Sequence, residues 1–358
     1  MKKSLIAFGA AMACIGAAQA QSNVQVSGLV DMYAGSMKLA GNDRTSVVGS
    51  GGMTTSWWGL NGTEDLGNGL KASFALGAFF RADTGEAGRW NVGNGAYDET
   101  FFARDANVSL SGGFGTVKLG RSMAPNFLPT ILFNPFGDSF TVSPLVIHAN
   151  MGWGLNSANH DYKTTAADTG WSNQVTYSTP SFGGLSASLH YQFGEQSGDN
   201  KSKKNVGANV MYFQGPLALT AFIERAQVGN PNPSIYLHTK QNWMLGGSYN
   251  FDFLKLYATY GQSEEKHTTS YDAKTTSLGM DVPVTKAGTF KAAAAYTKVD
   301  TGIPQDFKRT TYTLGYDHFL SKRTDVYSAV MYDKLKNMPI QADNGSGTSV
   351  AVGIRHRF

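Results

Sequence analysis

Apolar side chains alternate with polar or small ones along most of this chain. Leu254, Leu256 and Tyr260 fall on one face of an extended strand, whereas Lys255 and Thr259 fall on the other. The same alternation recurs in residues 24–34, 72–81, 185–193, 217–224, 291–297, 312–317 and 350–358. Each run is close to the ~9–11 residues of a tilted strand that crosses a membrane. The pattern therefore predicts many antiparallel strands, each with one apolar and one polar face.

The connections between these runs alternate in length. Short, glycine-containing connections lie at residues 64–69, 111–115, 181–184 and 213–216. Long polar connections lie near residues 36–52, 82–98, 194–205, 227–240, 263–273, 299–309 and 334–347. Short turns at one end and long loops at the other are typical of outer-membrane barrels. The sequence predicts an all-β, transmembrane antiparallel β-barrel of about sixteen strands, at roughly 21 residues per strand and connection, a size that encloses water.

A soluble β-sandwich or β-helix also has alternating strands. Three features disfavour both. The polar face carries small hydrophilic residues, and aromatic residues gather toward strand ends, as they do at membrane interfaces. The chain also lacks an internal repeat of the ~20–50 residues that a solenoid requires.

The first twenty residues predict export. Lys2 and Lys3 precede a short apolar run, which ends at the small-residue site formed by Ala18 and Ala20. This is the pattern of a secretory signal peptide cleaved after Ala20. We therefore expect a signal peptide at residues 1–20 and one barrel domain at residues 21–358.

Composition excludes several other classes of protein. Removal of Lys2 and Lys3 leaves 28 of the 30 basic residues against 26 acidic ones, a balance that argues against a nucleic-acid partner. The only cysteine, Cys14, lies in the signal peptide, so the exported chain has no disulfide. Charged residues make up 16% of the chain, below the usual ~25%.

The C-terminal segment VGIRHRF, residues 352–358, is itself an alternating strand. In lipid every strand must be paired, so the sheet must close and the last strand must reach the chain terminus. Phe358 resembles the terminal aromatic residue by which the outer-membrane assembly machinery recognises its barrels.

Several segments resemble the general porins of beta-proteobacteria. They are NVQVSGLVDMYAG (23–35), WWGLNGTEDLGNGLKASFAL (57–76), FFARDANVSLSGGFGTVKLGRSMAP (101–125), TYSTPSFGG (176–184), GYDHFLSKRTDVY (315–327) and VGIRHRF. The resemblance spans the mature chain in the family's order. It implies a homotrimer of barrels surrounded by outer-membrane lipid and lipopolysaccharide, without a cofactor. It also implies that a long third loop, here residues 122–170 after the fifth strand, folds into the lumen with residues 135–138 at its tip.

The resemblance implies which residues line the constriction. An arginine wall faces acidic loop residues in such porins, and Arg104 is the strongest candidate here. The other retained basic candidates are Arg81, Arg121 and Lys71, of which Lys71 lies near a periplasmic turn and is expected to be solvated. Asp138 is the natural opposing charge, because it is the one carboxylate in residues 122–160. That loop is otherwise rich in apolar residues, namely Phe127, Leu128, Ile131, Leu132, Phe133, Phe136 and Phe140.

This chain departs from the family at four positions. Trp57 and Asn61 stand where basic residues are common, Gly77 stands where a Glu is common, and an Arg is often found near Trp171. Trp57 has two interpretations: it packs under the apolar loop and anchors it, or it lines the constriction and stacks on an aromatic or sugar solute. Trp171 has the same two possibilities with a less certain strand register.

The leading functional hypothesis is a porin, a water-filled channel for passive diffusion of small hydrophilic solutes and ions, with selectivity set by pore width and charged rings. A narrower alternative is a channel that prefers weakly charged or aromatic molecules. A barrel enzyme lacks its motifs here, since the sequence has no G-x-S-x-G or H-E-x-x-H segment. An adhesin is disfavoured because the loops are modest in length.

Overall fold

The computed structural model describes residues 23–89, 99–150, 169–198, 203–229, 236–265, 271–300, 302, 305–337 and 344–358. Sixteen of its strands form one closed antiparallel ring, in which each pairs with the next along the chain and the last returns to the first. The predicted barrel of about sixteen strands is thus confirmed. The predicted signal peptide, residues 1–20, lies outside the described residues.

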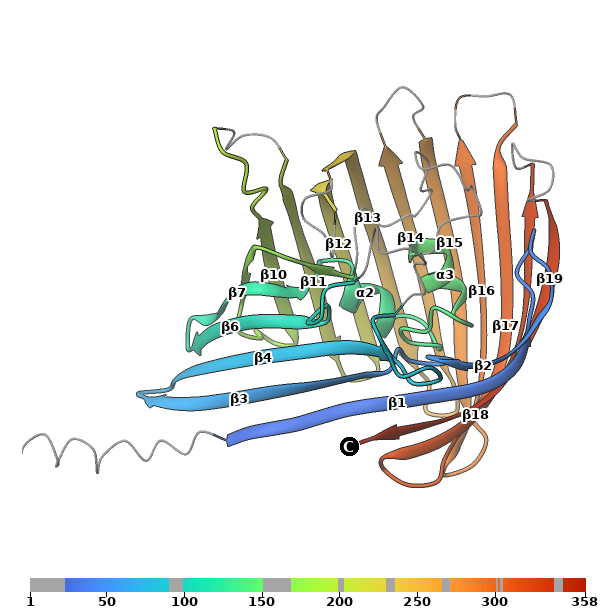
Figure 1. Ribbon diagram of the computed structural model, residues 1–358, viewed down its shortest axis with the longest axis horizontal. Coiled ribbons are helices and arrows are strands. Elements are labelled where there is room, and N and C mark those ends of the chain that lie inside the picture. Colours follow the sequence, from blue (N-terminus) through green and yellow to red (C-terminus); the bar gives the residue numbers. More distant parts are fainter. Residues whose placement is uncertain are drawn as a thin grey trace, which may run out of the picture.

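The strands of the ring differ in length between the two halves of the chain. They are β1 (Asn23–Met37), β3 (Trp57–Gly67), β4 (Leu70–Arg81), β6 (Asp105–Gly112), β7 (Gly115–Met123), β9 (Gln174–Ser178), β10 (Leu185–Gln192), β11 (Asn205–Gln214), β12 (Leu217–Val228), β13 (Tyr236–Asn250), β14 (Lys255–Glu265), β15 (Tyr271–Pro283), β16 (Gly288–Asp300), β17 (Phe307–Phe319), β18 (Thr324–Lys336) and β19 (Gly345–Arg357). Three short strands extend the wall: β2 (Thr45–Ser50) pairs with β1, β5 (Glu86–Ala87) with β4, and β8 (Gly170–Trp171) with β7. In Figure 1 the upright strands β10 to β17 form one side of the barrel, and β1, β3, β4, β6 and β7 lie across them.

The two ends of the described chain close the ring. β1 and β19 pair from Leu29 opposite Arg357 to Ser36 opposite Val350. Beyond this ladder, Gly28 and Phe358 each donate a backbone hydrogen bond to the other's carbonyl, both at 3.1 Å. A side chain at Gly28 would meet the Phe358 ring and would lie 2.7 Å from the Trp57 carbonyl oxygen. Gly28 therefore permits the close approach that completes the ring.

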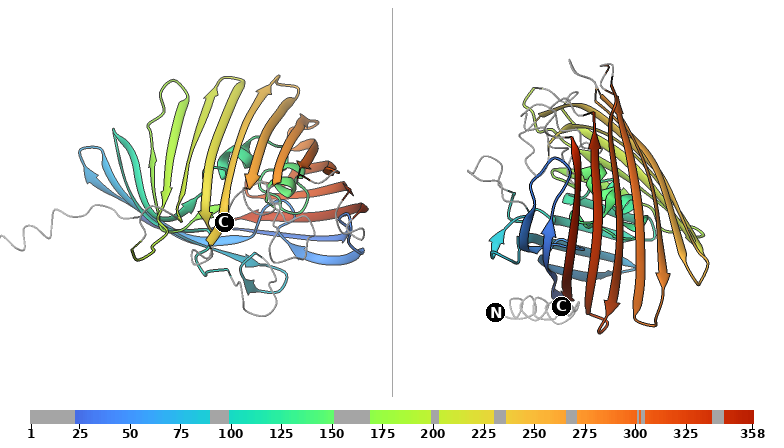
Figure 2. Two further views of the ribbon diagram at one scale, coloured as in Figure 1. Left: turned by 90° about the horizontal axis from the view of Figure 1, so that it is seen from above. Right: turned by 90° about the vertical axis from the view of Figure 1, so that its right-hand side faces the viewer.

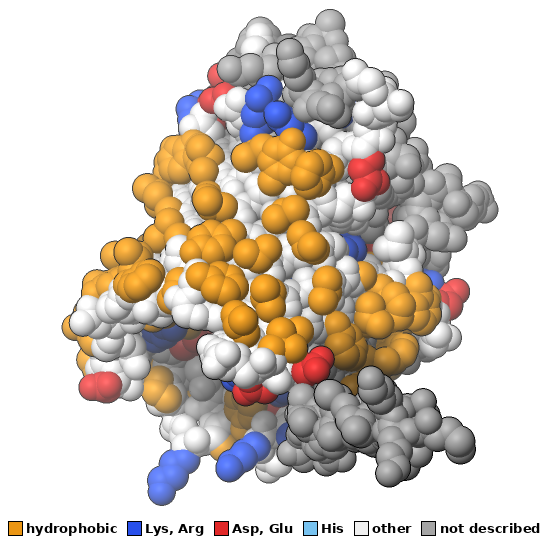
Figure 3. Space-filling model, turned by 90° about the vertical axis from the view of Figure 1, so that its left-hand side faces the viewer, with side chains coloured by type: hydrophobic (Ala, Val, Ile, Leu, Met, Phe, Trp, Pro, Cys, Tyr) orange, Lys and Arg blue, Asp and Glu red, His pale blue; other side chains and the backbone are white. Residues whose placement is uncertain are grey.

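The two faces of the wall differ as the alternation predicts. Along β12, Leu217, Leu219 and Ile223 are exposed, and Thr220 and Glu224 point inward and are buried. The outer apolar side chains form a broad band over the outside of the barrel, with charged side chains above and below it (Figure 3). The inner face is small and polar because it meets the loop and the lumen rather than lipid.

The connection from β3 to β4 shows why the short turns need glycine. Gly67, Asn68 and Gly69 have φ values of 82°, 53° and 78°. A side chain is rarely tolerated in this left-handed region, and Asn is among the residues that enter it most readily. The segment therefore reverses the chain with very few residues.

Two short helices lie inside the barrel. They are α2 (Phe127–Leu132) and α3 (Pro144–Asn150), both in the connection between β7 and β8. The view from above in Figure 2 shows them enclosed by the strands. The predicted third loop is therefore folded into the lumen after the fifth strand of the ring. The two strands that flank the loop, β7 and β8, extend slightly further than expected, since Ser122 and Met123 still pair with Trp171 and Gly170. Residues 151–168 of this loop lie outside the described residues.

Neither of the helices that the structure describes is long and apolar enough to cross a membrane.

Candidate functional site

The inward loop is held against the wall by buried polar anchors near its start. Glu224, which is 1% exposed, accepts hydrogen bonds from Asn126 Nδ2 at 3.0 Å and from Asn242 Nδ2 at 2.8 Å. Asn209 Nδ2 donates to the Pro125 carbonyl at 3.1 Å. Because buried polar groups are costly unless they are paired, these contacts fix the first turn of the loop on β11, β12 and β13.

The loop tip is held on two sides. Lys291 Nζ on β16 donates to the Pro135 carbonyl at 3.1 Å. On the other side, Ser139 Oγ donates to the Gly52 carbonyl at 2.7 Å and Thr141 Oγ1 to the Gly51 carbonyl at 2.9 Å. The tip therefore spans the lumen between β16 and the segment that joins β2 to β3.

The segment between β2 and β3 is itself fixed by a buried carboxylate. Asp31 Oδ2 accepts the backbone N–H groups of Met53 and Thr54, both at 2.7 Å, and Asp31 Oδ1 accepts the Tyr327 hydroxyl. Arg355 Nη1 adds a bond to Thr54 Oγ1 at 3.0 Å. These bonds come from side chains of the barrel wall, so the wall itself holds the segment on which the loop tip docks.

The second helix is clamped by His148, which is fully buried. Its two ring nitrogens lie 2.8 Å from Thr297 Oγ1 and 2.7 Å from Thr311 Oγ1. Burial, reinforced by the nearby Arg309 charge, holds the pKa of His148 well below its usual range. A neutral imidazole has one donor and one acceptor, and rotating hydroxyls can complement both.

Glycines on the inner wall make room for the loop. A Cβ at Gly207 would lie 2.5 Å from Pro125 Cγ, one at Gly279 would lie 2.6 Å from Pro135 Cγ, and one at Gly315 would lie 2.8 Å from Phe136 Cε1. Real Cβ atoms do not approach other atoms so closely. The loop therefore lies closer to the wall than any side chain at these positions would allow.

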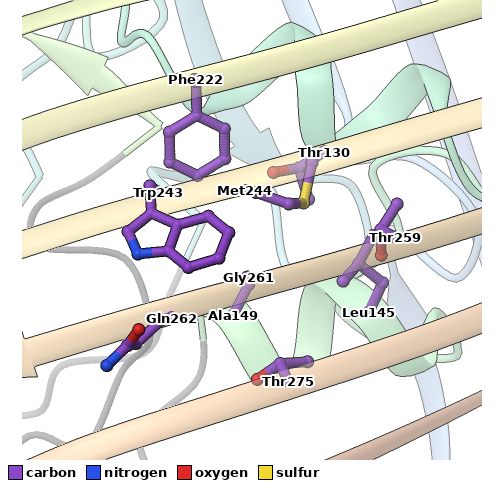
Figure 4. Close-up of a pocket in the computed structure, with 10 residues that line it drawn as sticks. All are labelled: Thr130, Leu145, Ala149, Phe222, Trp243, Met244, Thr259, Gly261, Gln262 and Thr275. Atoms are coloured by element: carbon purple, nitrogen blue, oxygen red, sulfur yellow. The ribbon is translucent and has the colours of Figure 1, made fainter.

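Little space remains behind the loop. Figure 4 shows the gap between the loop helices and strands β12 to β15, which has a volume of ≈ 30 Å³. It is lined by Thr130, Leu145, Ala149, Phe222, Trp243, Met244, Thr259, Gly261, Gln262 and Thr275. A gap of this size admits only a few waters, so it is much narrower than the cavity on the other side of the loop.

A larger cavity of ≈ 210 Å³ lies on the other side of the loop. Its wall side includes Trp57 on β3, Phe79 on β4 and Arg104 just before β6, and its loop side includes Phe127 and Asp138. The remaining lining residues are Thr54, Thr55, Arg89, Ala103, Asp105, Met123, Ile131, Phe140, Thr169 and Gly170. This cavity is the candidate constriction, because the loop narrows the lumen there.

Three predicted site residues meet in this cavity. The Arg104 guanidinium carbon lies 3.8 Å from the centroid of the Trp57 ring, and Arg104 Nη1 also forms an ion pair with Asp105. Asp138 faces them from the loop tip and accepts a hydrogen bond from Thr54. Burial raises the pKa of Asp138, and the charges of Arg355 and Arg104 partly oppose that rise.

The other predicted residues lie elsewhere. Arg121 is buried and donates to the carbonyls of Ala103 and Gly170, the latter at 3.0 Å, so it braces the base of the loop. Trp171 is also fully buried, and its ring packs edge-on against His190 with 6.2 Å between the ring centroids.

Arg81 and Lys71 lie nearer the two ends of β4. Arg81 forms an ion pair with Glu86 of β5. Lys71 is exposed beside Asp65 at the short-turn end. Neither lines the cavity of ≈ 210 Å³.

Sequence reasoning missed two charged pairs at the cavity. Asp105 follows Arg104 directly in the chain, and its register opposite Gly77 places it inside the barrel. Arg89 forms an ion pair with Glu99, and its guanidinium lies 4.7 Å from the Phe79 ring centroid. The sequence could have signalled Asp105 by adjacency, whereas Arg89 and Glu99 belong to a long connection without periodicity.

Known proteins with similar sequences and structures share this architecture. A family model described as Gram-negative porin matches residues 7–338. Outer membrane porin protein 32 of Delftia acidovorans is 35% identical over 379 residues, and the alignment covers 100% of both chains. An outer membrane porin protein of Bordetella pertussis is 28% identical over 415 residues, again covering 100% of both.

A solved porin structure is similar to this chain as well. The anion-selective porin from Comamonas acidovorans superposes with a TM-score of 0.76 at 29% identity, over 94% of this chain and 100% of that one. The likeness therefore extends across nearly the whole chain. The closed ring, the loop folded into its lumen and these relatives lead to one conclusion: the chain belongs to the Gram-negative porin family and forms an outer-membrane channel for passive diffusion of solutes and ions.

Proposed function

We propose that this channel is weakly ion-selective and that the cavity around Arg104, Trp57 and Asp138 sets its selectivity. The observation that supports this is the compensation of charge at the cavity. Arg104 is stacked on Trp57 and paired with Asp105, and Arg89 is paired with Glu99. Among the described lining residues the charges balance, with Arg89 and Arg104 against Asp105 and Asp138. Selectivity in such channels follows the net charge at the narrowest point, so compensated charges favour weak discrimination between small anions and cations.

The test is the reversal potential of the purified protein in a planar bilayer under a KCl gradient. We expect a value near zero for the native channel. Arg104→Ala removes one positive charge and leaves Asp105 unpaired, so it should shift the potential toward cation preference. Arg44→Ala serves as the control, because Arg44 is exposed and contacts Ser36 rather than the cavity. A strong anion preference in the native channel would contradict weak selectivity. If that preference then fell in Arg104→Ala, it would indicate the behaviour named for the Comamonas relative.

A second candidate is a preference for solutes with aromatic or apolar parts. The supporting observation is the aromatic lining of the cavity, where Trp57, Phe79, Phe127 and Phe140 lie around the charged groups. Aromatic faces stack on one another and on sugar rings with little hydrogen-bond selectivity. Liposome swelling with paired solutes of equal size, one aromatic and one aliphatic, distinguishes this candidate. Equal permeation rates would refute it.

We also propose the maturation and assembly that the sequence implies. The signal peptide is cleaved after Ala20, Phe358 is read by the outer-membrane assembly machinery, and the barrel forms a homotrimer. The intact mass of the protein isolated from outer membranes tests the first point, since the mature chain should begin at Gln21. Native mass spectrometry in mild detergent tests the third. Deletion of Phe358 should reduce the amount of assembled barrel more than it reduces synthesis.

A further inference from the structure

Four lysines form one continuous row on the outer face of the barrel. Lys274 on β15 lies directly opposite Lys298 on β16, Lys298 opposite Lys308 on β17, and Lys308 opposite Lys336 on β18. These four strands lie side by side in the right-hand view of Figure 2. All four side chains are exposed or half-exposed. Lys334 lies two residues from Lys336 on the same face.

Such a row is unfavourable without a counter-ion. Directly opposed side chains in an antiparallel pair are ≈ 4.5–5.5 Å apart at Cβ, and like charges there are destabilising. Two members have carboxylate partners: Lys274 pairs with Asp272 at 3.1 Å and Lys298 with Asp306 at 2.9 Å. Within the described residues, no acidic partner is found for Lys308 or Lys336. The row therefore keeps two cations available on one surface.

The position of the row along the strands shows at which depth of the membrane the lysines lie. One or two outward positions below it along the strands lie three exposed aromatic residues, Tyr296, Tyr312 and Tyr332. Below these lie Leu278, Leu314 and Val330 of the apolar band. Aromatic side chains mark the boundary between hydrocarbon and headgroups. The lysines therefore lie at the level of the lipid headgroups.

The end of the barrel identifies the leaflet. The row lies next to the connections from β14 to β15, β16 to β17 and β18 to β19, which are longer than the turns at residues 284–287 and 320–323. Long connections face the outside of the cell in outer-membrane barrels. The headgroups met there belong to the outer leaflet, where charged lipid is the phosphorylated glycolipid of lipopolysaccharide.

We infer that the row Lys274, Lys298, Lys308 and Lys336 is a binding site for the phosphate groups of this glycolipid, with Lys308 and Lys336 as its principal contacts. Ammonium groups bind phosphate as point charges and need no fixed geometry. The acyl chains of the same lipid would lie on the apolar band directly below. The site thus combines charge complementarity with the depth that a membrane lipid requires.

The test uses the purified full-length mature protein in non-ionic detergent and measures bound lipid by native mass spectrometry. The probes are diphosphoryl lipid A, lipid A with both phosphates removed, and phosphatidylglycerol. We expect the diphosphoryl form to bind most tightly. Each lysine near a charged membrane surface contributes about fivefold, so Lys308→Gln with Lys336→Gln should weaken that binding about 25-fold. The single variants should each weaken it about fivefold.

Two controls separate charge at this site from general effects. Lys286→Gln with Lys322→Gln removes the same charge from exposed turns at the opposite end of β15 to β18 and should leave binding unchanged. Lys308→Arg with Lys336→Arg keeps the charge and should also retain binding. Single-channel conductance should be native in every variant, because the lysines of the row lie on the outer face and the two control lysines are exposed on turns. Native conductance therefore reports correct folding.

Three results would overturn the site. One is binding of diphosphoryl lipid A that stays within about twofold of native in the double glutamine variant. Another is equal binding of the dephosphorylated lipid, which would assign the affinity to acyl chains alone. The third is equal binding of phosphatidylglycerol, which would show a general anion patch rather than a glycolipid site.

Discussion

The Arg104 guanidinium carbon lies 3.8 Å from the centroid of the Trp57 indole ring, and the same guanidinium forms an ion pair with Asp105. The arginine is thus held against the wall by a flat aromatic surface and a carboxylate. Gly77 adds room for it, since its Cβ position is 3.3 Å from both Arg104 Cβ and Asp105 Oδ2. Trp57 and Gly77 therefore both contact Arg104 directly, Trp57 through its ring and Gly77 through its carbonyl, which accepts the Arg104 N–H at 3.1 Å.

Trp57→Ala should release Arg104 into the lumen. Stacking of this kind contributes about 0.5–2 kcal/mol, so its loss leaves the side chain free to reorient. We expect a larger single-channel conductance, because a bulky ring is removed, and a reversal potential shifted toward anion preference. Trp58→Ala is the control: Trp58 points to the other face, where it packs against Phe101, and its conductance should be native. An unchanged potential in Trp57→Ala would show that the stacking does not restrain the charge.

Gly279→Ala should push the loop tip away from the wall. The added Cβ would overlap Pro135, whose ring is rigid, so the loop or β15 must shift. Overpacking of this kind costs about 1–3 kcal/mol. We expect a lower conductance together with a lower thermal unfolding midpoint. Gly113→Ala is the matched change, since no atom lies within 4 Å of its Cβ position and its backbone is ordinary. Native conductance in Gly279→Ala would mean that the wall yields instead of the loop.

His148→Ala should loosen the second loop helix. The substitution removes both hydrogen bonds of the imidazole, at about 0.5–1.5 kcal/mol each. The two hydroxyls keep one partner each, since Thr297 also contacts Thr275 at 2.7 Å and Thr311 donates to Asp333 at 2.6 Å. We expect the channel to close at lower voltage and to unfold at lower temperature. His148→Gln, which keeps one donor and one acceptor, should recover part of both losses.

The stability of the protein should also fall in acid because of His148. Its pKa is lowered in the folded state, so the unfolded chain binds the proton first as the pH drops below its usual value of about 6.5. Stability that is complete above this value is then progressively lost below it. Thermal unfolding midpoints of the native protein and His148→Gln at several pH values measure the contribution of His148 to this loss of stability. Parallel pH profiles would assign the acid sensitivity to other groups.

Selectivity should respond to pH through Asp138. Because burial raises its pKa, this carboxyl loses its negative charge at a higher pH than an ordinary aspartate, whose pKa is about 3.9. Lowering the pH from about 7 should therefore move the reversal potential toward anion preference before carboxylates of ordinary pKa are protonated. Asp138→Asn should show this displaced potential at neutral pH and lack that part of the pH response. A native pH response in Asp138→Asn would exclude the residue as the titrating group.

The sequence alone predicts the barrel, its strand number and the position of the inward loop, because these depend on local alternation and on connection length. It does not predict the surroundings of Arg121 or Trp171. Both lie where the loop returns to the wall, and their contacts join segments about fifty residues apart. Gly120 adds to the difficulty, since its φ of 110° interrupts the regular alternation of β7 just before Arg121.

The sequence also does not predict which wall residues anchor the loop. From the sequence pattern, Glu224 is an ordinary inward polar residue of β12. In the same pattern Gly207, Gly279 and Gly315 are small residues of a water-facing inner wall. Their role depends on which loop atoms lie opposite them, and that is a tertiary relationship without a periodic signal. The pairing of Arg104 with Trp57 is of the same kind.

The pairing of β1 with β19 has a consequence for how the protein is made. The contacts that close the ring join residues more than three hundred positions apart, so the ring cannot close around a partial chain. Every shorter intermediate has two open edges, each a template for pairing with another chain and each untenable in lipid. The chain must therefore be kept from aggregation until its final strand is available, and insertion must be nearly concerted with closure. The hydrogen bonds between Gly28 and Phe358 are, in this sense, the end point of biogenesis as well as a feature of the mature wall.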